Sequence, residues 1–340
     1  MKGKNWIENQ MTNANIHRYY IALKPWINSI AKKLKCSPNG TFFLMTRAAT
    51  AFICFALASL SLAGQPVFQV GMFSDNPKKH VPLLLPMAEY LADKMQPFGY
   101  TSGKPQIFAD FDSARQAFQS GDLDILTCGL YEAAQMISSG DASPLAIKWK
   151  YGVPEYSSLI IVNSESEIYE LSDLVGKTIG FEDPGSTSAY FLPYQALLKA
   201  KLPLKMSDVN NQTSNAINYR FTDSEQNSSA LLLQNKIDAI ALSDYDWLKS
   251  DHITSGQRSK FRIIWISDLY PRALEVVRAD MPSEQIIQLE QELTSMHLHS
   301  EAQHALDNYH ETVRFSYINE NHLEQLQELI DLISNLEQTE

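Results

Sequence analysis

Short apolar runs alternate with segments of helical periodicity along most of the chain after residue 65. Val67–Phe73 has the β-rich composition of a strand, and Leu83–Met95 has apolar residues at helical spacing. Pro82 suits the first turn of that helix, where a proline costs no helical hydrogen bond. Two more strands and two more helices follow in alternation: Gln106–Ala109, Ser113–Gln119, Leu123–Thr127 and Tyr131–Ile137. Strands separated by helices predict a parallel sheet with crossover helices.

A second set of elements repeats this pattern from Ser157–Val162 onward. Strands and helices again alternate in it: Thr178–Glu182, Thr187–Lys199, Ile217–Thr222, Ser224–Gln234 and Ala239–Leu242. Two further strands, Phe261–Ile266 and Ala273–Arg278, precede a helical tail, for which Ser283 is the expected N-cap. Two α/β units joined by crossing strands predict an α/β fold with two lobes and a small-ligand cleft between them.

An apolar stripe marks the last helix of the tail: Leu323, Leu326, Ile330 and Ile333. Spacings of three and four residues place these side chains on one face of a helix. We expect this face to dock on the core of a monomer. A seam between two copies of the chain is the alternative.

Charge is distributed unevenly along the chain. Residues 1–63 contain eight lysines and arginines and one acid, which leaves 20 basic and 38 acidic residues in the rest. A body with a net charge of −18 repels phosphate backbones and anionic lipid, because binding them requires a basic face. The sequence therefore predicts no nucleic-acid partner.

The N-terminal part contains an apolar run, residues 48–64, that carries no charged side chain. Arg47 precedes the run and small residues end it, which is the pattern of a secretory signal peptide. We expect residues 45–63 to be that signal peptide, with cleavage near residue 64 and export of the mature protein. Met45 is then the translation start and residues 1–44 are an extension; an uncleaved anchor helix is the alternative.

The cysteines and histidines indicate neither a disulfide framework nor a metal site. Cys36 and Cys54 lie before the expected cleavage point, so Cys128 alone remains in the mature protein, as a packed thiol. Four histidines lie in the helical tail: His297, His299, His304 and His310. Their spacing does not place two ligands on one helix face, so we expect no metal, no cofactor and no catalytic residue.

Three consecutive hydroxyl residues, Ser186, Thr187 and Ser188, open a predicted helix after a strand and an Asp-Pro-Gly turn. The first N–H groups of a helix have no intrahelical partner, and the helix dipole is positive there. With three hydroxyl groups added, this helix start is a candidate site for a phosphate-like anion. Ordinary capping of the helix by one serine is the alternative.

Five segments carry a resemblance to a known family: Phe68–Gly71, Ser120–Ile125, Tyr156–Val162, Leu171–Thr178 and Asp183–Pro193. They resemble the phosphate-, phosphite- and phosphonate-binding components of ABC importers, which are type 2 periplasmic binding proteins. The Ser-Thr-Ser turn followed by Tyr190 is the specific part. The resemblance implies a two-lobed α/β fold with hinge strands and a ligand cleft between the lobes. Lobe 1 is expected to comprise residues 65–156 plus 270–340, and lobe 2 residues 157–269.

The resemblance also implies ligand-binding residues. Ser186, Thr187 and Ser188 match the oxyanion turn, and Tyr156 matches a cleft tyrosine before the hinge strand. Phe111 stands where the family often has a second cleft tyrosine, so the ring is kept and the hydroxyl is lost.

Three further positions depart from the family pattern or leave it open. Glu225 stands near the place of a histidine that aminophosphonate binders use. Arg272 and Ala273 stand where a carboxylate for the ligand amine is expected, and Arg272 is a candidate to reach the anion from the opposite lobe. Asp244, or Asp246, is the remaining candidate for a cleft carboxylate.

The resemblance implies a periplasmic protein that binds a phosphorus oxyanion (phosphonate, phosphite or phosphate) and delivers it to a membrane ABC permease. The main alternative is an exported ligand-sensing protein of the same fold that feeds a membrane signalling protein. An enzyme on the same scaffold would need a nucleophile with a nearby base, and Cys128 has no evident histidine partner. A partner-binding protein with a degenerate cleft is the third alternative.

Overall fold

The computed structural model describes residues 66–337, apart from residues 75, 209 and 250–252. The described residues belong to one compact unit. The expected N-terminal extension and signal peptide, residues 1–44 and 45–63, lie outside the described residues. Among the described residues, no helix has the length and apolar character needed to cross a membrane.

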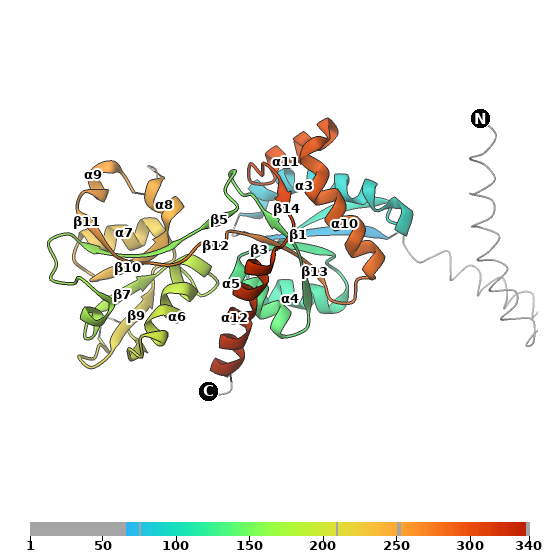
Figure 1. Ribbon diagram of the computed structural model, residues 1–340. Helices are drawn as coiled ribbons and strands as arrows, with labels where there is room; N and C mark the ends of the chain where they lie inside the picture. The colour runs from blue at the N-terminus through green and yellow to red at the C-terminus, as the bar shows by residue number, and fades with distance from the viewer. Residues whose placement is uncertain (1–65, 75, 209, 250–252, 338–340) are drawn as a thin grey trace, which may run out of the picture. The chain divides into compact units, whose positions relative to one another are not determined.

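Two six-stranded sheets form the framework, and a two-stranded ribbon links them (Figure 1). The first sheet has the order β14-β4-β13-β3-β1-β2, with these bounds: β1 Val67–Phe73, β2 Ser102–Phe108, β3 Ile125–Cys128, β4 Ala142–Lys148, β13 Leu274–Arg278 and β14 Phe315–Ser316. The second has the order β11-β6-β10-β7-β9-β8: β6 Ser158–Asn163, β7 Thr178–Phe181, β8 Leu204–Met206, β9 Ile217–Phe221, β10 Ala239–Ser243 and β11 Phe261–Ile266. The ribbon pairs β5 (Glu155–Tyr156) with β12 (Tyr270–Pro271).

Lobe 1 is the first sheet with its helices, and lobe 2 is the second sheet with its helices. The helices of lobe 1 are α3 Pro77–Lys94, α4 Phe111–Ser120, α5 Leu130–Ser138, α10 Ser283–Ser295, α11 Gln303–Asn308 and α12 Glu320–Glu337. Those of lobe 2 are α6 Leu192–Lys199, α7 Glu225–Leu233, α8 Asp244–Leu248 and α9 Ser255–Arg258. Short 3-10 turns lie at η1 Gln96–Phe98, η2 Leu171–Leu174, η4 Met296–Leu298 and η5 Ser300–Ala302. The predicted boundaries after residues 156 and 269 remain predictions; they fall at the end of β5 and just before β12.

Both sheets are mixed, so the prediction of parallel sheets is wrong in part. β2, β1 and β3 are parallel to one another, as are β8, β9, β7 and β10. In each lobe, however, a strand that arrives from the ribbon runs antiparallel to its neighbours. β13 lies between β3 and β4 in lobe 1, and β6 lies between β10 and β11 in lobe 2. Each lobe thus receives one strand directly after a passage through the ribbon.

Helix α3 begins earlier than the sequence predicts, so Pro82 is not in its first turn. Asn76 is the N-cap, and its side-chain oxygen accepts a hydrogen bond from the backbone N–H of Lys79 at 3.2 Å. Pro77 then takes the first helical position, and Pro82 lies inside the helix. Ser283 is likewise not an N-cap but the first residue of α10, because Pro282 holds the cap position.

The predicted helix from Thr187 to Lys199 has two parts, a π-helical turn η3 (Thr187–Phe191) and then α6. Pro193 explains the irregularity, since it has no N–H to donate to the carbonyl of Ala189. The backbone N–H of Glu182 donates to that carbonyl instead, at 3.3 Å. The turn therefore ties the helix start to the end of β7.

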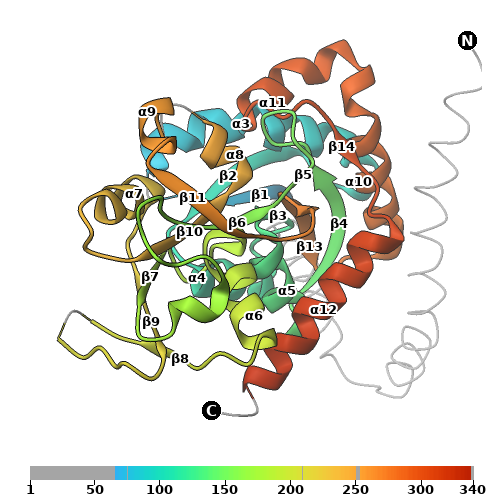
Figure 2. The same cartoon turned by 60° about the vertical axis from the view of Figure 1, so that its left-hand side comes forward.

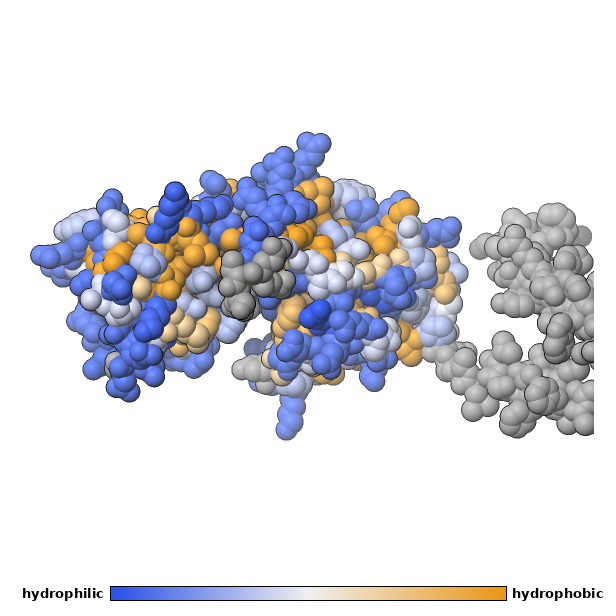
Figure 3. Space-filling model, turned by 90° about the horizontal axis from the view of Figure 1, so that it is seen from below, coloured by the Kyte–Doolittle hydropathy of each residue, from blue (hydrophilic) through white to orange (hydrophobic). Residues whose placement is uncertain are grey.

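The last helix docks on lobe 1, as the apolar stripe predicts. α12 packs along α5 (Figure 2), where Leu326, Leu329 and Ile333 are buried. Leu323, which the prediction places in the stripe, is 49% exposed because it lies in the first turn, before the helix reaches α5. The face drawn in Figure 3 is mostly hydrophilic, with hydrophobic side chains gathered in places over both lobes.

Candidate functional site

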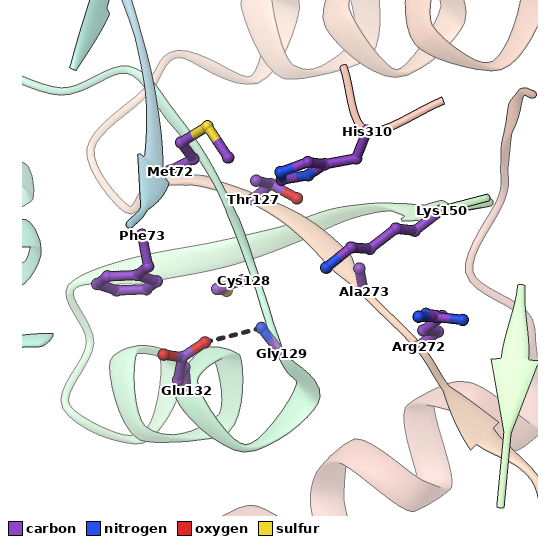
Figure 4. Close-up of a pocket in the computed structure, with 10 residues that line it drawn as sticks. All are labelled: Met72, Phe73, Thr127, Cys128, Gly129, Glu132, Lys150, Arg272, Ala273 and His310. Carbon is purple, nitrogen blue, oxygen red and sulfur yellow. Dashed lines mark hydrogen bonds between the residues drawn. The ribbon is translucent and has the colours of Figure 1, made fainter. Parts of the chain in front are cut away.

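Two cavities share Lys150 and Arg272 in their walls. The interlobe cavity, of about 370 Å³, is lined from both lobes by Lys150, Tyr151, Tyr156, Glu182, Ser188, Glu225, Ser243, Tyr245, Asp246, Lys249 and Arg272. The lobe 1 cavity, of about 180 Å³, is lined by Met72, Phe73, Thr127, Cys128, Gly129, Glu132, Lys150, Arg272, Ala273 and His310 (Figure 4). Lys150 follows the end of β4 by two residues, and Arg272 directly follows β12.

The Ser-Thr-Ser segment lies at the start of η3, with each hydroxyl group in a different role. Ser186 is the N-cap, and its Oγ accepts a hydrogen bond from the N–H of Ala189 at 3.1 Å. Thr187 is buried, and its Oγ1 accepts from the N–H of Tyr131 at 3.0 Å, which joins lobe 2 to the start of α5. Ser188 lines the interlobe cavity.

Tyr156 is brought next to this helix start by β5. Its side chain is buried and lines the interlobe cavity. Burial raises the pKa of Tyr156 to about 12, while hydrogen bonds with the side chains of Ser188 and Thr187 act in the opposite direction. The phenol is thus a neutral hydrogen-bonding group beside the predicted oxyanion turn.

Five of the predicted site residues do not line either cavity: Ser186 and Thr187, whose hydrogen bonds are described above, and Phe111, Tyr190 and Asp244. Phe111 is the first residue of α4 and packs against the core of lobe 1. Tyr190 packs edge-on against Phe181 and Phe221, with ring centroids 5.3 and 5.0 Å apart. Asp244 begins α8, and its neighbour on the same helix, Asp246, lines the interlobe cavity. Their roles in binding remain predictions.

Arg272 lies under a pair of aromatic rings that meet across the lobes. Tyr151 of lobe 1 and Tyr245 of α8 are stacked, with centroids 5.9 Å apart and planes 9° apart. The Arg272 guanidinium lies 3.8 Å from the Tyr245 centroid and 5.5 Å from that of Tyr151. Its Nη1 is buried without a hydrogen-bond partner among the described residues. This stacking orients a cation toward the cavity.

Sequence reasoning named Asp246 and Glu225 but missed two other carboxyl groups that line the cavities, Glu182 and Glu132. Burial raises the pKa of Glu182 to about 9, and the charge of Glu225 and a hydrogen bond with it act in the same direction. In the lobe 1 cavity, burial raises the pKa of Glu132 to about 7, although the Gly129 N–H donates to its Oε2 at 2.8 Å. Glu182 directly precedes the Asp-Pro-Gly turn, and this position was the one local signal for it.

A buried polar network supports the wall of the lobe 1 cavity. The Nζ of Lys148 lies 3.2 Å from the centroid of the Tyr309 ring and donates to Thr127 Oγ1 at 3.4 Å. The Tyr309 hydroxyl donates to Glu275 Oε2 at 3.1 Å. Burial lowers the pKa of Lys148 to about 7 and raises that of Glu275 to about 7.

Cys128 and His310 are two of the residues for which the sequence predicts no role in metal binding, and burial shifts the pKa of both side chains. Within the described part of the chain, no three His, Cys, Asp or Glu side chains are grouped to hold a metal ion. Cys128 is a free, buried thiol at the end of β3, and burial raises its pKa. Burial and the nearby Lys148 and Lys150 lower the pKa of His310 to about 2.

Comparison with known proteins identifies the family. Residues 70–323 match the model of the family described as ABC transporter, phosphonate, periplasmic substrate-binding protein. The phosphonates-binding periplasmic protein of Escherichia coli (strain K12) is 27% identical over 168 residues, which are 48% of this chain and 47% of that protein. The chain thus spans about half the length of this curated relative.

Solved structures share the fold. XAC2383 of Xanthomonas citri, solved with chloride and with ATP, is 25% identical, with TM-scores of 0.75 and 0.74; the alignments cover 80% of this chain and 99% and 98% of the other. PhnD1 of Prochlorococcus marinus, in complex with methylphosphonate, is 18% identical with a TM-score of 0.56, over 78% of this chain and 98% of PhnD1. The chain therefore belongs to the periplasmic substrate-binding proteins of phosphonate ABC transporters, a family of binding proteins and not of enzymes.

Proposed function

We propose that this protein is the periplasmic solute-binding component of an ABC importer and binds a phosphorus oxyanion between its lobes, at the Ser186–Ser188 helix start. The observation that carries the proposal is one cavity, lined from both lobes, whose lining brings together Ser188 of lobe 2 with Tyr156 and Arg272 of the ribbon side. A cavity of this kind at a lobe junction is where small ligands bind.

The chemistry of the wall suits an oxyanion. The first N–H groups of η3 and the Ser188 hydroxyl are donors at the positive end of a helix. Tyr156 adds a phenol, and Arg272 adds a guanidinium whose Nη1 has no partner among the described residues. Burial and the neighbouring Glu225 raise the pKa of Glu182, which favours a protonated carboxyl group that donates a hydrogen bond over a repelling charge.

The relatives support the same ligand class. The Escherichia coli relative is named for phosphonates, and PhnD1 was solved with methylphosphonate. XAC2383 was solved with two anions, chloride and ATP. We infer that the lobes of this protein close about β5 and β12, so that charge-assisted hydrogen bonds form in a desolvated site. The closed monomer then docks on a membrane permease.

A ligand panel tests the proposal. The purified full-length chain is melted with phosphate, phosphite, methylphosphonate, aminoethylphosphonate, sulfate, ATP and an uncharged sugar. A ligand at 100 times its Kd stabilises the fold by about 2.7 kcal/mol. We expect a clear shift with at least one phosphorus oxyanion, and its loss in the Ser186→Ala/Ser188→Ala double variant.

The control variant is Thr254→Ala, which removes a helix N-cap outside the cavities. No shift with any phosphorus compound, or an equal loss in the control, would contradict the proposal. The importer role is tested separately with the reconstituted permease, whose ATP hydrolysis the liganded protein should stimulate. Ligand binding without that stimulation would favour the sensor alternative.

A further inference from the structure

Lys150 is a cation that the predicted oxyanion turn does not use. It follows β4 by two residues, and a tight turn fixes it, since the Val153 N–H donates to its carbonyl at 3.1 Å. The side chain points into the lobe 1 cavity (Figure 4) and also lines the interlobe cavity. Among the described residues, its Nζ makes no hydrogen bond and no ion pair, and its one ring contact, to Tyr151, is 5.8 Å long.

Arg272 is in the same situation on the same wall. Its guanidinium stacks on Tyr245, but its side chain makes no hydrogen bond or ion pair within the described part of the chain. Lys150 and Arg272 are half-buried cations that share a cavity and repel each other. Burial and the charge of Arg272 lower the pKa of Lys150, while nearby carboxylates act in the opposite direction. Such a pair is unfavourable in the free protein, and an anion placed between the two cations relieves the repulsion.

The nearby acids Asp246, Glu182 and Glu225 favour the charged form of Lys150, but none of them forms an ion pair with it among the described residues. Asp246 lines the interlobe cavity, but its Oδ2 accepts a hydrogen bond from Ser243 Oγ at 2.5 Å, and no ion pair links it to Lys150. Glu182 and Glu225 also line that cavity, and their proximity raises the pKa of Glu182. In the lobe 1 cavity, Glu132 is engaged by the backbone N–H of Gly129.

The cavities are larger than one tetrahedral anion requires. A cavity volume of about 10–15 Å³ is enough to hold one water molecule. The volume of the interlobe cavity is about 370 Å³, and that of the lobe 1 cavity is about 180 Å³. Lys150 and Arg272 line both cavities. A ligand can therefore extend from Ser188 to Lys150 and Arg272 with two separate charged groups.

We propose that Lys150 and Arg272 form a second anion-binding subsite, and that the ligand carries a phosphoryl group and a second anionic group on one small molecule. This inference rests on the proposed function, because the first group is the oxyanion at Ser186–Ser188. The second group, a carboxylate or another phosphoryl group, then binds between Lys150 Nζ and Arg272 Nη1. Charge-assisted hydrogen bonds to both cations favour such a ligand over a simple alkyl phosphonate.

Calorimetric titration of the purified full-length chain tests the subsite. The probes are methylphosphonate, with one anionic group, and phosphonoacetate, pyrophosphate and ATP, with more than one. We expect at least one of these three probes to bind tighter than methylphosphonate by roughly tenfold or more. Lys150→Gln should abolish most of that preference and change the methylphosphonate Kd by less than about threefold.

Two further variants serve as a control and as a second test. Lys104→Gln removes an exposed lysine of β2 outside both cavities and should leave every Kd unchanged. Arg272→Gln provides an independent test if Lys150→Gln does not fold. Because Arg272 also serves the first oxyanion in the proposed function, this variant should weaken every probe, and the probes with more than one anionic group more than methylphosphonate. Phosphonoacetate and pyrophosphate, compared directly, show whether the second group is a carboxylate or a phosphoryl group.

The outcomes separate this inference from the proposed function. Methylphosphonate that binds as tightly as all three larger probes would overturn the second subsite and leave the proposed function standing. An equal loss for all probes in Lys150→Gln would place Lys150 on the first oxyanion and also overturn the inference. No binding of any phosphorus compound would contradict the proposed function itself.

Discussion

The two walls of the interlobe cavity differ in their chemistry. The wall from lobe 1 and the ribbon carries the unpartnered cations Lys150 and Arg272, and the Lys148–Tyr309–Glu275 network is buried behind it. The lobe 2 wall carries hydroxyl groups and three carboxyl groups, with one cation, Lys249, among them: Ser188, Ser243, Glu182, Glu225, Asp246 and Lys249. Both lobes have a mixed sheet with one strand arriving from the ribbon, so this difference is not one of fold.

The comparison indicates how a strongly acidic protein can bind an anion. The lobe 1 wall supplies the cations Lys150 and Arg272. The lobe 2 wall supplies N–H groups at a helix start, a serine hydroxyl and one cation, Lys249, beside its carboxyl groups. Under the proposed function, closure of the lobes would gather the donors of both walls around the anion. Four predictions follow this comparison from the largest expected effect to the smallest.

The lobe 1 wall should depend on its buried charges. Glu275→Ala removes a fully buried carboxyl group whose charge favours the protonated form of the fully buried Lys148, so we expect the free energy of unfolding to fall by about 3–5 kcal/mol. Urea denaturation measures this change. Glu225→Gln is the matched change in lobe 2 and should be neutral or stabilising, because it relieves repulsion with Glu182. A loss below about 1 kcal/mol for Glu275→Ala would remove the distinction between the walls.

Glu182 of the lobe 2 wall should make the free energy of unfolding depend on pH. The pKa of Glu182 is about 9 in the folded protein and 4.5 for an ordinary glutamate. Between these values the folded protein keeps a proton that the unfolded chain releases, so stability falls as pH rises, by up to about 1.4 kcal/mol per unit. Glu182→Gln should match the wild type near pH 4.5 and exceed it by roughly 2–4 kcal/mol at pH 9. Parallel urea stability profiles for the two proteins would refute this.

The hydrogen bond between Thr187 of lobe 2 and Tyr131 of lobe 1 should affect closure of the lobes. Thr187→Val removes the acceptor for the Tyr131 N–H of α5, so the closed form loses about 1–1.5 kcal/mol. We expect the Kd of the tightest phosphorus ligand to rise by roughly 5- to 10-fold in calorimetry. Thr187→Ser keeps the acceptor and should restore the affinity. Equal affinities for the valine and serine variants would show that this bond does not contribute to closure.

The smallest effect should come from the helix cap. Ser186→Ala removes the acceptor for the Ala189 N–H and should cost about 1 kcal/mol of stability in thermal denaturation. Ser188→Ala caps nothing and lines the cavity, so it should lower ligand affinity more than stability. The reverse order for the two serines would mean that Ser186, not Ser188, contacts the ligand.

The sequence predicts elements well where local pattern decides them. The bounds of β1 and β11 are confirmed to the residue, because both are runs of β-branched and aromatic side chains. Strand β4 was not predicted, since its sequence contains Pro144 and Lys148 and its partners, β13 and β14, lie more than a hundred residues later. Long-range pairing of this kind leaves no local periodicity to detect.

The candidate site shows the same limit. Ser188, Tyr156 and Arg272 were predicted and line the interlobe cavity, although their role in binding is untested. Lys150 was missed because nothing beside it in the chain marks it; only the fold places it next to Arg272, 122 residues further on. A lone lysine after a strand becomes notable only when its surroundings are known.

The exchange of strands between the lobes has a consequence for protein synthesis. All six strands of the second sheet lie within residues 158–266, so lobe 2 can form as soon as that stretch has left the ribosome. The first sheet needs β13, which lies between β3 and β4, and β14 at residues 315–316. The half of the molecule that is translated first must therefore wait, with one edge of β3 and both edges of β4 unpaired, and becomes the last to fold.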